Sequence, residues 1–255
     1  MLRRVTLLGV LATLICFMPG AASPLQAAST RFIRIATLVP RDSDLARSFL
    51  KLESFERAGW KLIGWSEAGQ YRWFSRGPNQ RPSDLQQRRP WLWPASFILK
   101  ELYHVVGCNG VPLGVPEVFG ALQTRMIDTV ISTAAALVAL QWHPTLKHVT
   151  QQTFGVLING LVMSGSKWKQ LPPDVAAMLM AESARLIAAE RADVREADRR
   201  SYENLLNRGY TADKWAPNGY EEYVDVEKRV RERLVNRLYT PELPQRVMTI
   251  AKQAS

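Results

Sequence analysis

The sequence predicts an α/β fold, and three observations lead to this prediction. Short apolar segments that fit buried strands alternate with segments whose apolar residues recur every three or four positions, the period of an amphipathic helix. Glycine or proline stands at many of the junctions, where it ends one element or opens the next. The chain has 255 residues, 47% of them hydrophobic, which is enough for a substantial core in one or two domains. Alternation of strands and helices favours a mostly parallel sheet flanked by helices.

The N-terminal residues have the pattern of a targeting segment. A basic pair, Arg3-Arg4, precedes an apolar stretch at 5–18, which ends at Pro19-Gly20 and is followed by small residues. This order is typical of a secretory signal peptide. The apolar stretch is shorter than the ~20 residues that a spanning helix needs, which favours export with cleavage over an uncleaved anchor. We expect residues 1–27 to be a cleaved signal peptide and the mature protein to lie in the periplasm.

Cysteine content and charge exclude several classes of protein. Cys16 lies in the expected signal peptide, so the mature chain holds Cys108 alone and cannot form an intramolecular disulfide. We expect Cys108 to be a small buried hydrophobe, and together with His104 it makes no metal site. The net charge of +10 comes from arginines interleaved with acidic residues, which favours a solvated surface over nucleic-acid binding. We expect no cofactor, no metal and no nucleic-acid partner.

Between the signal peptide and position 107, apolar runs and turn residues predict seven elements. A strand at 31–39 is closed by Pro40, and Asp42, Ser43 and Asp44 cap the helix that follows. Trp91 and Trp93 alternate on a short strand, so both side chains face the same way, either lining a cleft or packing under a helix. The full order is a strand at 31–39, a helix from Leu45 to Gly59, strands at 60–65 and 71–75, a turn or short helical start at 81–85, a strand at 91–93 and a helix from Pro94 to Gly107.

Residues 111–142 carry the clearest strand–helix joints. Gly114 and Pro116 open a helix, because proline suits the first helical position. Ser132 and Thr133 follow a β-branched run, where they could cap the next helix or bind a ligand at the carboxyl end of a strand. The predicted order is a strand from Val111, a helix from Pro116, a strand at 129–131 and a helix from Ala134 to Trp142.

The last part of the chain is dominated by one long helix. Its apolar residues return at helical spacing from Asp174 to about Arg208, a length of roughly 50 Å at ~1.5 Å per residue. Its many Glu and Arg residues exclude burial on all sides, so we expect it to lie across the body of the protein. Around it we predict strands at 147–152 and 154–164, a turn at 167–173, a stop at Gly209, a helix from about Glu221 to Leu238 and a final helix after Pro241.

Four segments, in order, resemble one protein family. Residues 114–124, GVPEVFGALQT, followed by Ile127-Asp128, resemble the signature of solute-binding proteins of tripartite ATP-independent periplasmic (TRAP) transporters, the DctP family. The segments RIATLVP at 34–40, RPSDL at 81–85 and SGSKWKQLPP at 164–173 also resemble this family. Together they cover most of the mature chain, which makes the set specific.

The resemblance implies a fold, a function and a division of the chain. The fold is periplasmic-binding-protein-like (type II, TRAP receptor), with two α/β lobes around a cleft and a long helix across both. The implied function is capture of an organic acid or a more apolar small molecule and its delivery to a TRAP membrane permease. The implied division is 28–59 as a remnant of the first lobe, 60–173 as the second α/β lobe, and 174–255 as the long helix and C-terminal helices packing across both lobes.

One departure from the family pattern affects the ligand. The arginine that pairs with a ligand carboxylate in typical members falls at or beside Trp91 in this sequence, while Arg89 lies slightly earlier. Indole rings favour apolar or aromatic ligands and cannot form the bidentate carboxylate contact. The expected ligand-binding residues are Trp91, Trp93, Ser132, Thr133 and Arg89.

A second departure is the short first lobe. Ser48-Phe49-Leu50 leads almost directly to the strand at Trp60, which leaves no room for most of that lobe. Either the receptor is internally shortened, or another chain, in an oligomer or a partner complex, supplies the second wall. The alternative function is therefore a degenerate receptor that acts as a structural or interaction module without ligand. We expect no enzyme, because no Ser-His-Asp, paired-carboxylate or phosphate-loop pattern stands out and an exported hydrolase has no motif in its favour.

Overall fold

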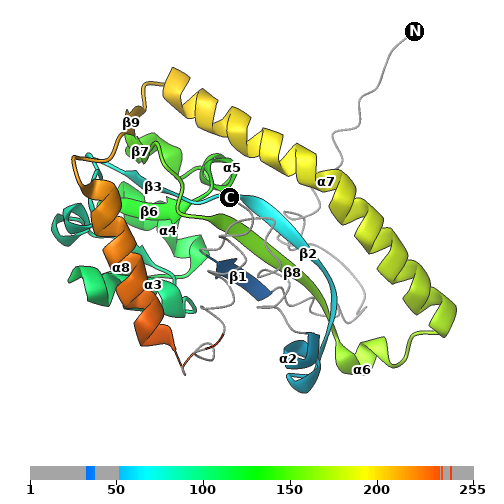
Figure 1. Ribbon diagram of the computed structural model, residues 1–255. Helices are drawn as coiled ribbons and strands as arrows, with labels where there is room; N and C mark the ends of the chain where they lie inside the picture. Colours follow the sequence, from blue (N-terminus) through cyan, green and yellow to red (C-terminus); the bar gives the residue numbers. More distant parts are fainter. Residues whose placement is uncertain (1–32, 38–51, 236, 238–241, 243–255) are drawn as a thin grey trace, which may run out of the picture. The chain divides into compact units, whose positions relative to one another are not determined.

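A computed structural model describes residues 33–37, 52–235, 237 and 242, all within one compact unit, Arg31–Ser255 (Figure 1). Strands and helices alternate along the chain, as the sequence predicts for an α/β fold. The expected signal peptide, the first part of the helix expected from Leu45 and, apart from residue 242, the helix expected after Pro241 lie outside the described residues. No helix in the described ranges combines the length and apolar composition that crossing a membrane requires.

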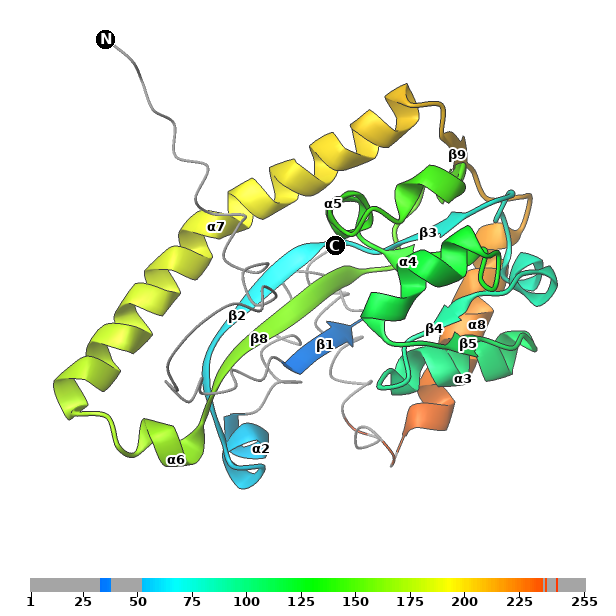
Figure 2. The same cartoon turned by 180° about the vertical axis from the view of Figure 1, so that it is seen from behind.

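The first sheet has three strands, in the order β1 (Ile33–Thr37), β8 (Val156–Ser164), β2 (Trp60–Gln70), and both pairings are antiparallel (Figure 2). Trp65 pairs with Gly160, where a β-carbon would lie 3.1 Å from the indole ring, so glycine lets the ring lie flat on the neighbouring strand. Helix α2 (Leu52–Arg57) contacts β2 through Phe55, which packs with Leu62 and Val162.

The second sheet has four strands, in the order β6 (Thr129–Ser132), β3 (Arg72–Ser75), β7 (His148–Thr150), β9 (Thr211–Asp213). Strand β3 is antiparallel to both of its neighbours, and β7 is parallel to β9. The short strands β4 (Trp91–Leu92) and β5 (Val111–Pro112) form a separate parallel pair, which Pro90 bridges to Thr129.

The expectation of a mostly parallel sheet is wrong. Strand–helix alternation gives parallel neighbours only where each helix crosses over between two adjacent strands. Four of the six described strand pairings are antiparallel, and they join strands that lie far apart in the sequence, such as β2 with β8 and β3 with β7.

Capping side chains fix the first residues of helices α3 and α4. Helix α3 (Phe97–Val106) begins three residues after the expected Pro94, because the Ser96 hydroxyl accepts from the Leu99 N–H at 3.2 Å and fixes the start there. Helix α4 (Val115–Gln123) has its capping carboxylate, since the Glu117 carboxylate accepts from the Gly114 N–H at 2.6 Å. The turn at 81–85 is the 3-10 helix η2 (Pro82–Gln87).

Helix α5 (Ala134–Ala139) is shorter than the predicted 134–142. Gln141 has a left-handed φ of 58°, and the Trp142 N–H donates to the Leu137 carbonyl at 3.0 Å. This turn ends the helix before Trp142, and a short 3-10 helix, η3 (His143–Thr145), follows.

The predicted long helix is confirmed as α7 (Pro173–Asn207), which runs alongside β2 (Figure 1). A β-carbon at Gly64 of β2 would lie 2.4 Å from the end of Ile187, so the glycine allows the helix to approach closely. The exposed side carries Glu–Arg pairs one turn apart, which explains its polar composition. Gly209, with φ of 86°, follows its end, and helix α6 (Gly165–Trp168) occupies the start of the expected turn.

Helix α8 (Gly219–Leu234) packs along α3, and both lie beside the second sheet (Figures 1 and 2). It ends earlier than the predicted Leu238 because Val235 leaves the helical conformation with ψ of 137°. Buried side chains of η2, β3, α3 and α8 form one of the apolar clusters, with Trp73, Leu85, Tyr103, Val226 and Val230 among its members.

Candidate functional site

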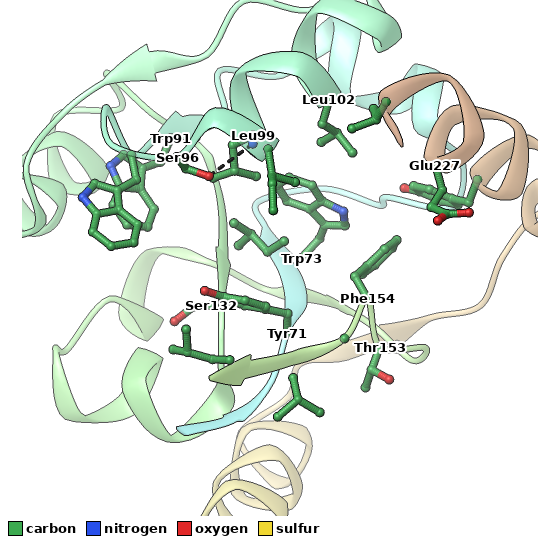
Figure 3. A pocket seen from close by; sticks show the side chains of 18 of the residues that line it. Tyr71, Trp73, Trp91, Ser96, Leu99, Leu102, Ser132, Thr153, Phe154 and Glu227 are labelled. Carbon is green, nitrogen blue, oxygen red and sulfur yellow. Dashed lines mark hydrogen bonds between the residues drawn. The ribbon is translucent and has the colours of Figure 1, made fainter. Parts of the chain in front are cut away.

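A cavity of about 530 Å³ opens between the second sheet, β4, the start of β8 and helices α3, α5 and α8 (Figure 3). This volume lies within the ~300–1,000 Å³ range of small-molecule sites. Its lining is mostly aliphatic and aromatic, and on the sheet side it includes Tyr71, Trp73, Trp91, Trp93, Trp142 and Phe154. The cavity can therefore hold a small molecule with a large apolar surface.

Trp91 is both a core residue and a wall of the cavity. Its ring is 6% exposed and stands edge-on to Trp142, with ring centroids 5.3 Å apart. Its indole N–H donates to the Leu113 carbonyl at 2.9 Å, and its own carbonyl accepts from the Tyr103 hydroxyl at 2.7 Å. Because the N–H is already bonded, Trp91 presents only its aromatic surface to the cavity. Trp91 therefore packs in the core and also lines the cavity, and its contact with a ligand stays a prediction.

Trp93 and Ser132 line the same cavity. Trp93 lies just beyond the end of β4 and is half-buried against the larger apolar cluster. Ser132 ends β6, and in Figure 3 its side chain points toward the same part of the cavity as Tyr71. The structure thus brings together Trp91, Trp93 and Ser132, three of the five expected site residues.

Thr133 and Arg89 do not line the cavity. The buried Thr133 hydroxyl accepts from the Ala136 N–H at 3.2 Å and caps α5, the structural role that the sequence left open for it. Arg89 pairs with Asp128, with Nε and Oδ2 3.6 Å apart, and its backbone N–H donates to the same carboxylate at 2.9 Å. Direct ligand contact by these two residues stays a prediction.

Three arginines, on β3 and in the segment between β3 and β4, bond to backbone carbonyls. Arg88 donates to the Pro78 carbonyl at 2.9 Å, and Arg76 donates to the Leu122 carbonyl at 2.7 Å. Arg72 donates to the Thr150 carbonyl at 3.0 Å, and its Cζ lies 4.2 Å from the centroid of the Tyr202 ring. Burial lowers the pKa of the Arg72 guanidinium. Within the described ranges, no lysine, arginine or histidine lines the cavity.

Helix α8 contributes cavity-lining residues that the sequence reasoning missed. Tyr220, Tyr223 and Glu227 line the far end of the cavity, together with Trp215. The three residues of α8 are spaced by three and then four positions, which places their side chains on one face of the helix. This spacing was the signal in the sequence that could have identified them. Glu227 is the only Asp or Glu that lines the cavity in the part of the chain that the structure describes.

The described residues hold no group of three or more His, Cys, Asp or Glu side chains that could bind a metal ion. Cys108 is buried, as expected, and burial raises the pKa of its thiol to about 11. A thiol with that pKa stays protonated at neutral pH and is a poor nucleophile.

Residues 43–236 match the family described as bacterial extracellular solute-binding protein, family 7, or DctP. The chain belongs to this family. The match spans most of the chain, so the resemblance that the four segments indicated is confirmed.

Two curated relatives of this solute-binding protein are also similar to it. The C4-dicarboxylate-binding periplasmic protein DctP of Shewanella loihica is 28% identical over 137 residues, which cover 54% of this chain and 40% of that protein. A solute-binding protein of a Sulfitobacter species is 24% identical over 131 residues, covering 51% of this chain and 39% of that protein. The aligned part of the chain thus spans about 40% of the length of these relatives.

Solved structures of TRAP receptors show the same fold. A receptor from Shewanella oneidensis with bound succinate superposes with a TM-score of 0.73 at 24% identity, covering 81% of this chain and 70% of that one. Receptors from Bordetella pertussis, binding pyroglutamic acid, and from Desulfovibrio salexigens, with bound orotic acid, each give a TM-score of 0.72 at 16% and 17% identity. They cover 82% and 85% of this chain, and 68% and 71% of those chains. The predicted periplasmic-binding-protein-like fold is therefore confirmed, in a chain that matches only part of the longer receptors.

Proposed function

We propose that this protein is an extracytoplasmic receptor that captures a small molecule and delivers it to the membrane permease of a TRAP-type secondary transporter. One observation carries the proposal: an aromatic cavity of about 530 Å³ in a solute-binding fold, where Trp91, Trp93 and Ser132 converge. Aromatic surface supplies affinity for an apolar ligand, and a few polar groups such as the Ser132 hydroxyl fix its orientation.

The cavity favours the more apolar of the two ligand classes that the sequence indicates. The solved relatives bind succinate, pyroglutamic acid and orotic acid, all of them organic acids. Here Trp91 stands at or beside the position of the family arginine, and none of the described basic side chains lines the cavity. Thr133 caps the start of α5 and Arg89 pairs with Asp128 in the segment before β4, and direct contact of both residues with the ligand stays a prediction.

The proposal includes the division of the chain and its location. Residues 1–27 are the signal peptide that directs the receptor to the periplasm, 28–59 the remnant of the first lobe, 60–173 the second lobe, and 174–255 the helices that pack across both. A second copy or the permease itself would complete the wall that the first lobe supplies in longer receptors. Closure over the ligand would be a hinge motion stabilised by ligand contacts.

Ligand-dependent thermal unfolding tests the proposal. A panel of organic acids, amino acids, amines and aromatic metabolites should contain a compound that raises Tm by several degrees at 100 times its Kd, because binding to the native state alone stabilises it by about 2.7 kcal/mol. Ala136→Trp, which fills the cavity, should abolish the shift, whereas Ala139→Trp on the exposed side of α5 should keep it. No stabilisation by any compound, or equal shifts in both variants, would contradict the proposal.

The alternative is a receptor remnant that serves as an interaction module. Three large apolar side chains favour it: Phe97 at the start of α3 and Tyr220 and Val224 on α8 are 59%, 57% and 46% exposed. Co-purification with the permease subunits separates the two functions. Association that needs Tyr220 and Val224 but is indifferent to the cavity-filling Ala136→Trp would favour the module over the receptor.

A further inference from the structure

We infer that the α8 end of the cavity recognises a positively charged nitrogen, so that the ligand is an amine with an apolar or aromatic body. This inference rests on the proposed receptor function and names its ligand class.

The charge that lines the cavity is negative. Glu227 lines it on α8, and in the described part of the chain no lysine, arginine or histidine does so. A ligand carboxylate would lose its hydration shell in the cavity without gaining a cationic partner. It would also be repelled by the negative charge of Glu227. An ammonium group would gain an opposite charge in the same place. The cavity therefore discriminates against anions and in favour of cations.

Glu227 is only weakly neutralised by its neighbours. Its Oε2 lies 3.3 Å from Nη2 of Arg231, one helical turn away, and both side chains are partly exposed. Pairs of this kind on a helix surface are weak. Glu101 on α3 offers a contrast, because Arg233 and Arg237 bond both of its oxygens. No described residue donates a hydrogen bond to Oε1 of Glu227, so this oxygen can accept one from a ligand N–H.

Aromatic rings surround this end of the cavity. Phe154 and Tyr223 stand edge-to-face with ring centroids 4.9 Å apart, and Trp215 lies 5.6 Å from Tyr223. Figure 3 shows Phe154 and Glu227 together on the α8 side. The faces of such rings attract cations, and the attraction grows as water is excluded. The Tyr223 hydroxyl is buried and bonds to no described residue, so Tyr223 contributes its ring to this end of the cavity.

The opposite end of the cavity suits the rest of such a ligand. Trp91, Trp93 and Trp142 form an uncharged aromatic wall beside Ser132. An aromatic or aliphatic body that lies along this wall places its amine toward α8. The inferred ligand is therefore elongated, apolar at one end and cationic at the other.

Three compounds with the same indole ring test the inference by isothermal titration calorimetry. Tryptamine is cationic at neutral pH, tryptophol is neutral and indole-3-acetate is anionic. We expect tryptamine to bind at least about tenfold more tightly than indole-3-acetate, with tryptophol between them. Glu227→Gln should weaken tryptamine binding about tenfold and leave tryptophol binding unchanged. Glu227→Lys should reverse the order and favour indole-3-acetate.

Asp225→Asn is the matched control, because it removes one negative charge from an exposed position of α8 that does not line the cavity. It should leave the order of the three affinities unchanged. Glu227 is partly exposed, so both Glu227 variants should melt at the temperature of the parent protein in the absence of ligand.

Two results would overturn the inference while leaving the receptor function in place. The first is binding of indole-3-acetate as tightly as tryptamine, or a preference for tryptamine that survives Glu227→Gln. The second is binding of acids or neutral compounds from the broader panel with no binding of any amine. Absence of binding by every compound, with identical behaviour of the Ala136→Trp variant, would overturn the receptor function itself.

Discussion

Asp198 on the long helix α7 accepts a hydrogen bond from the backbone N–H of Gln70, the last residue of β2, with an N–O distance of 2.9 Å. The other oxygen of the same carboxylate accepts from the Ala135 N–H in the first turn of α5 at 3.0 Å. Asp198 is 6% exposed, and both bonds are part-buried. One buried carboxylate thus fastens α7 both to the first sheet and to the helix that carries Ala136 into the cavity wall.

Asp198→Ala should lower the free energy of unfolding by about 2–3 kcal/mol. The substitution leaves two part-buried backbone N–H groups without an acceptor, and each costs about 1–3 kcal/mol when it stays unsatisfied. Urea denaturation followed by circular dichroism measures the change. Asp193→Ala, at an exposed position of the same helix, is the control and should change the stability by less than about 0.5 kcal/mol. Equal effects of the two substitutions would remove the structural role assigned to Asp198.

Gly69→Ala should be more destabilising than Gly59→Ala. Both glycines have positive φ, +103° and +80°, so alanine strains the backbone at either position. At Gly69 an added β-carbon would also lie 2.6 Å from Cγ of Asp198, whereas at Gly59 it would meet nothing within 4 Å. We expect Gly59→Ala to cost about 1 kcal/mol and Gly69→Ala to exceed it by at least about 1 kcal/mol. Urea denaturation of both variants measures the difference. A smaller loss of unfolding free energy in Gly69→Ala than in Gly59→Ala would contradict the close packing of Gly69 against Asp198.

Local sequence signals predicted the positions of most helices. The pairing of strands that lie far apart in the sequence could not be predicted from it. Pro116 and Glu117 mark the start of α4 because a helix start is encoded within a few residues. The direction of β8 relative to β2 depends on residues about ninety positions apart, and no short motif encodes it. The mostly parallel sheet was predicted for that reason, and it was wrong.

The candidate site was predictable on one side of the cavity only. Ser132 and Thr133 are adjacent polar residues at a strand end, and only the geometry shows that the first lines the cavity while the second caps α5. Trp91 and Trp93 are two residues apart on a predicted strand, so the sequence placed both side chains on the same face of that strand. Glu227 lies more than 130 positions after Trp93 in the sequence. Its place at the other end of the cavity from Trp91 and Trp93 depends on the packing of α8 against α3.

Trp93→Ala should weaken ligand binding more than it weakens folding. Trp93 is half-buried and lines the cavity, so its removal takes aromatic contact area from the ligand and leaves most of the core intact. We expect tryptophol binding to weaken by about tenfold, equivalent to about 1.4 kcal/mol. Calorimetry measures this loss, and Trp168→Ala, on α6 outside the cavity lining, is the control that should keep the affinity. Unchanged affinity in Trp93→Ala would place the ligand away from this wall.

The contact of Glu101 with Arg233 and Arg237 should make stability depend on acidic pH. Glu101 on α3 is 8% exposed, and Arg233 of α8 donates to it at 2.7 Å. Hydrogen bonds from Arg233 and then Arg237, opposed by burial, hold the pKa of the Glu101 carboxyl below its usual range. A carboxyl whose pKa is lowered by folding stabilises the native state above its unfolded pKa, and that contribution is lost as the pH falls through the folded pKa.

Glu101→Gln should therefore lower the free energy of unfolding by about 1–2 kcal/mol at pH 7, and the difference from the parent protein should shrink as the pH falls below about 4. Urea denaturation at a series of pH values checks this. Glu182→Gln, which removes an exposed surface pair with Arg185, should give a difference near zero at every pH. A Glu101→Gln effect that stays constant between pH 7 and pH 3 would show that shape, and not charge, explains the contact between α3 and α8.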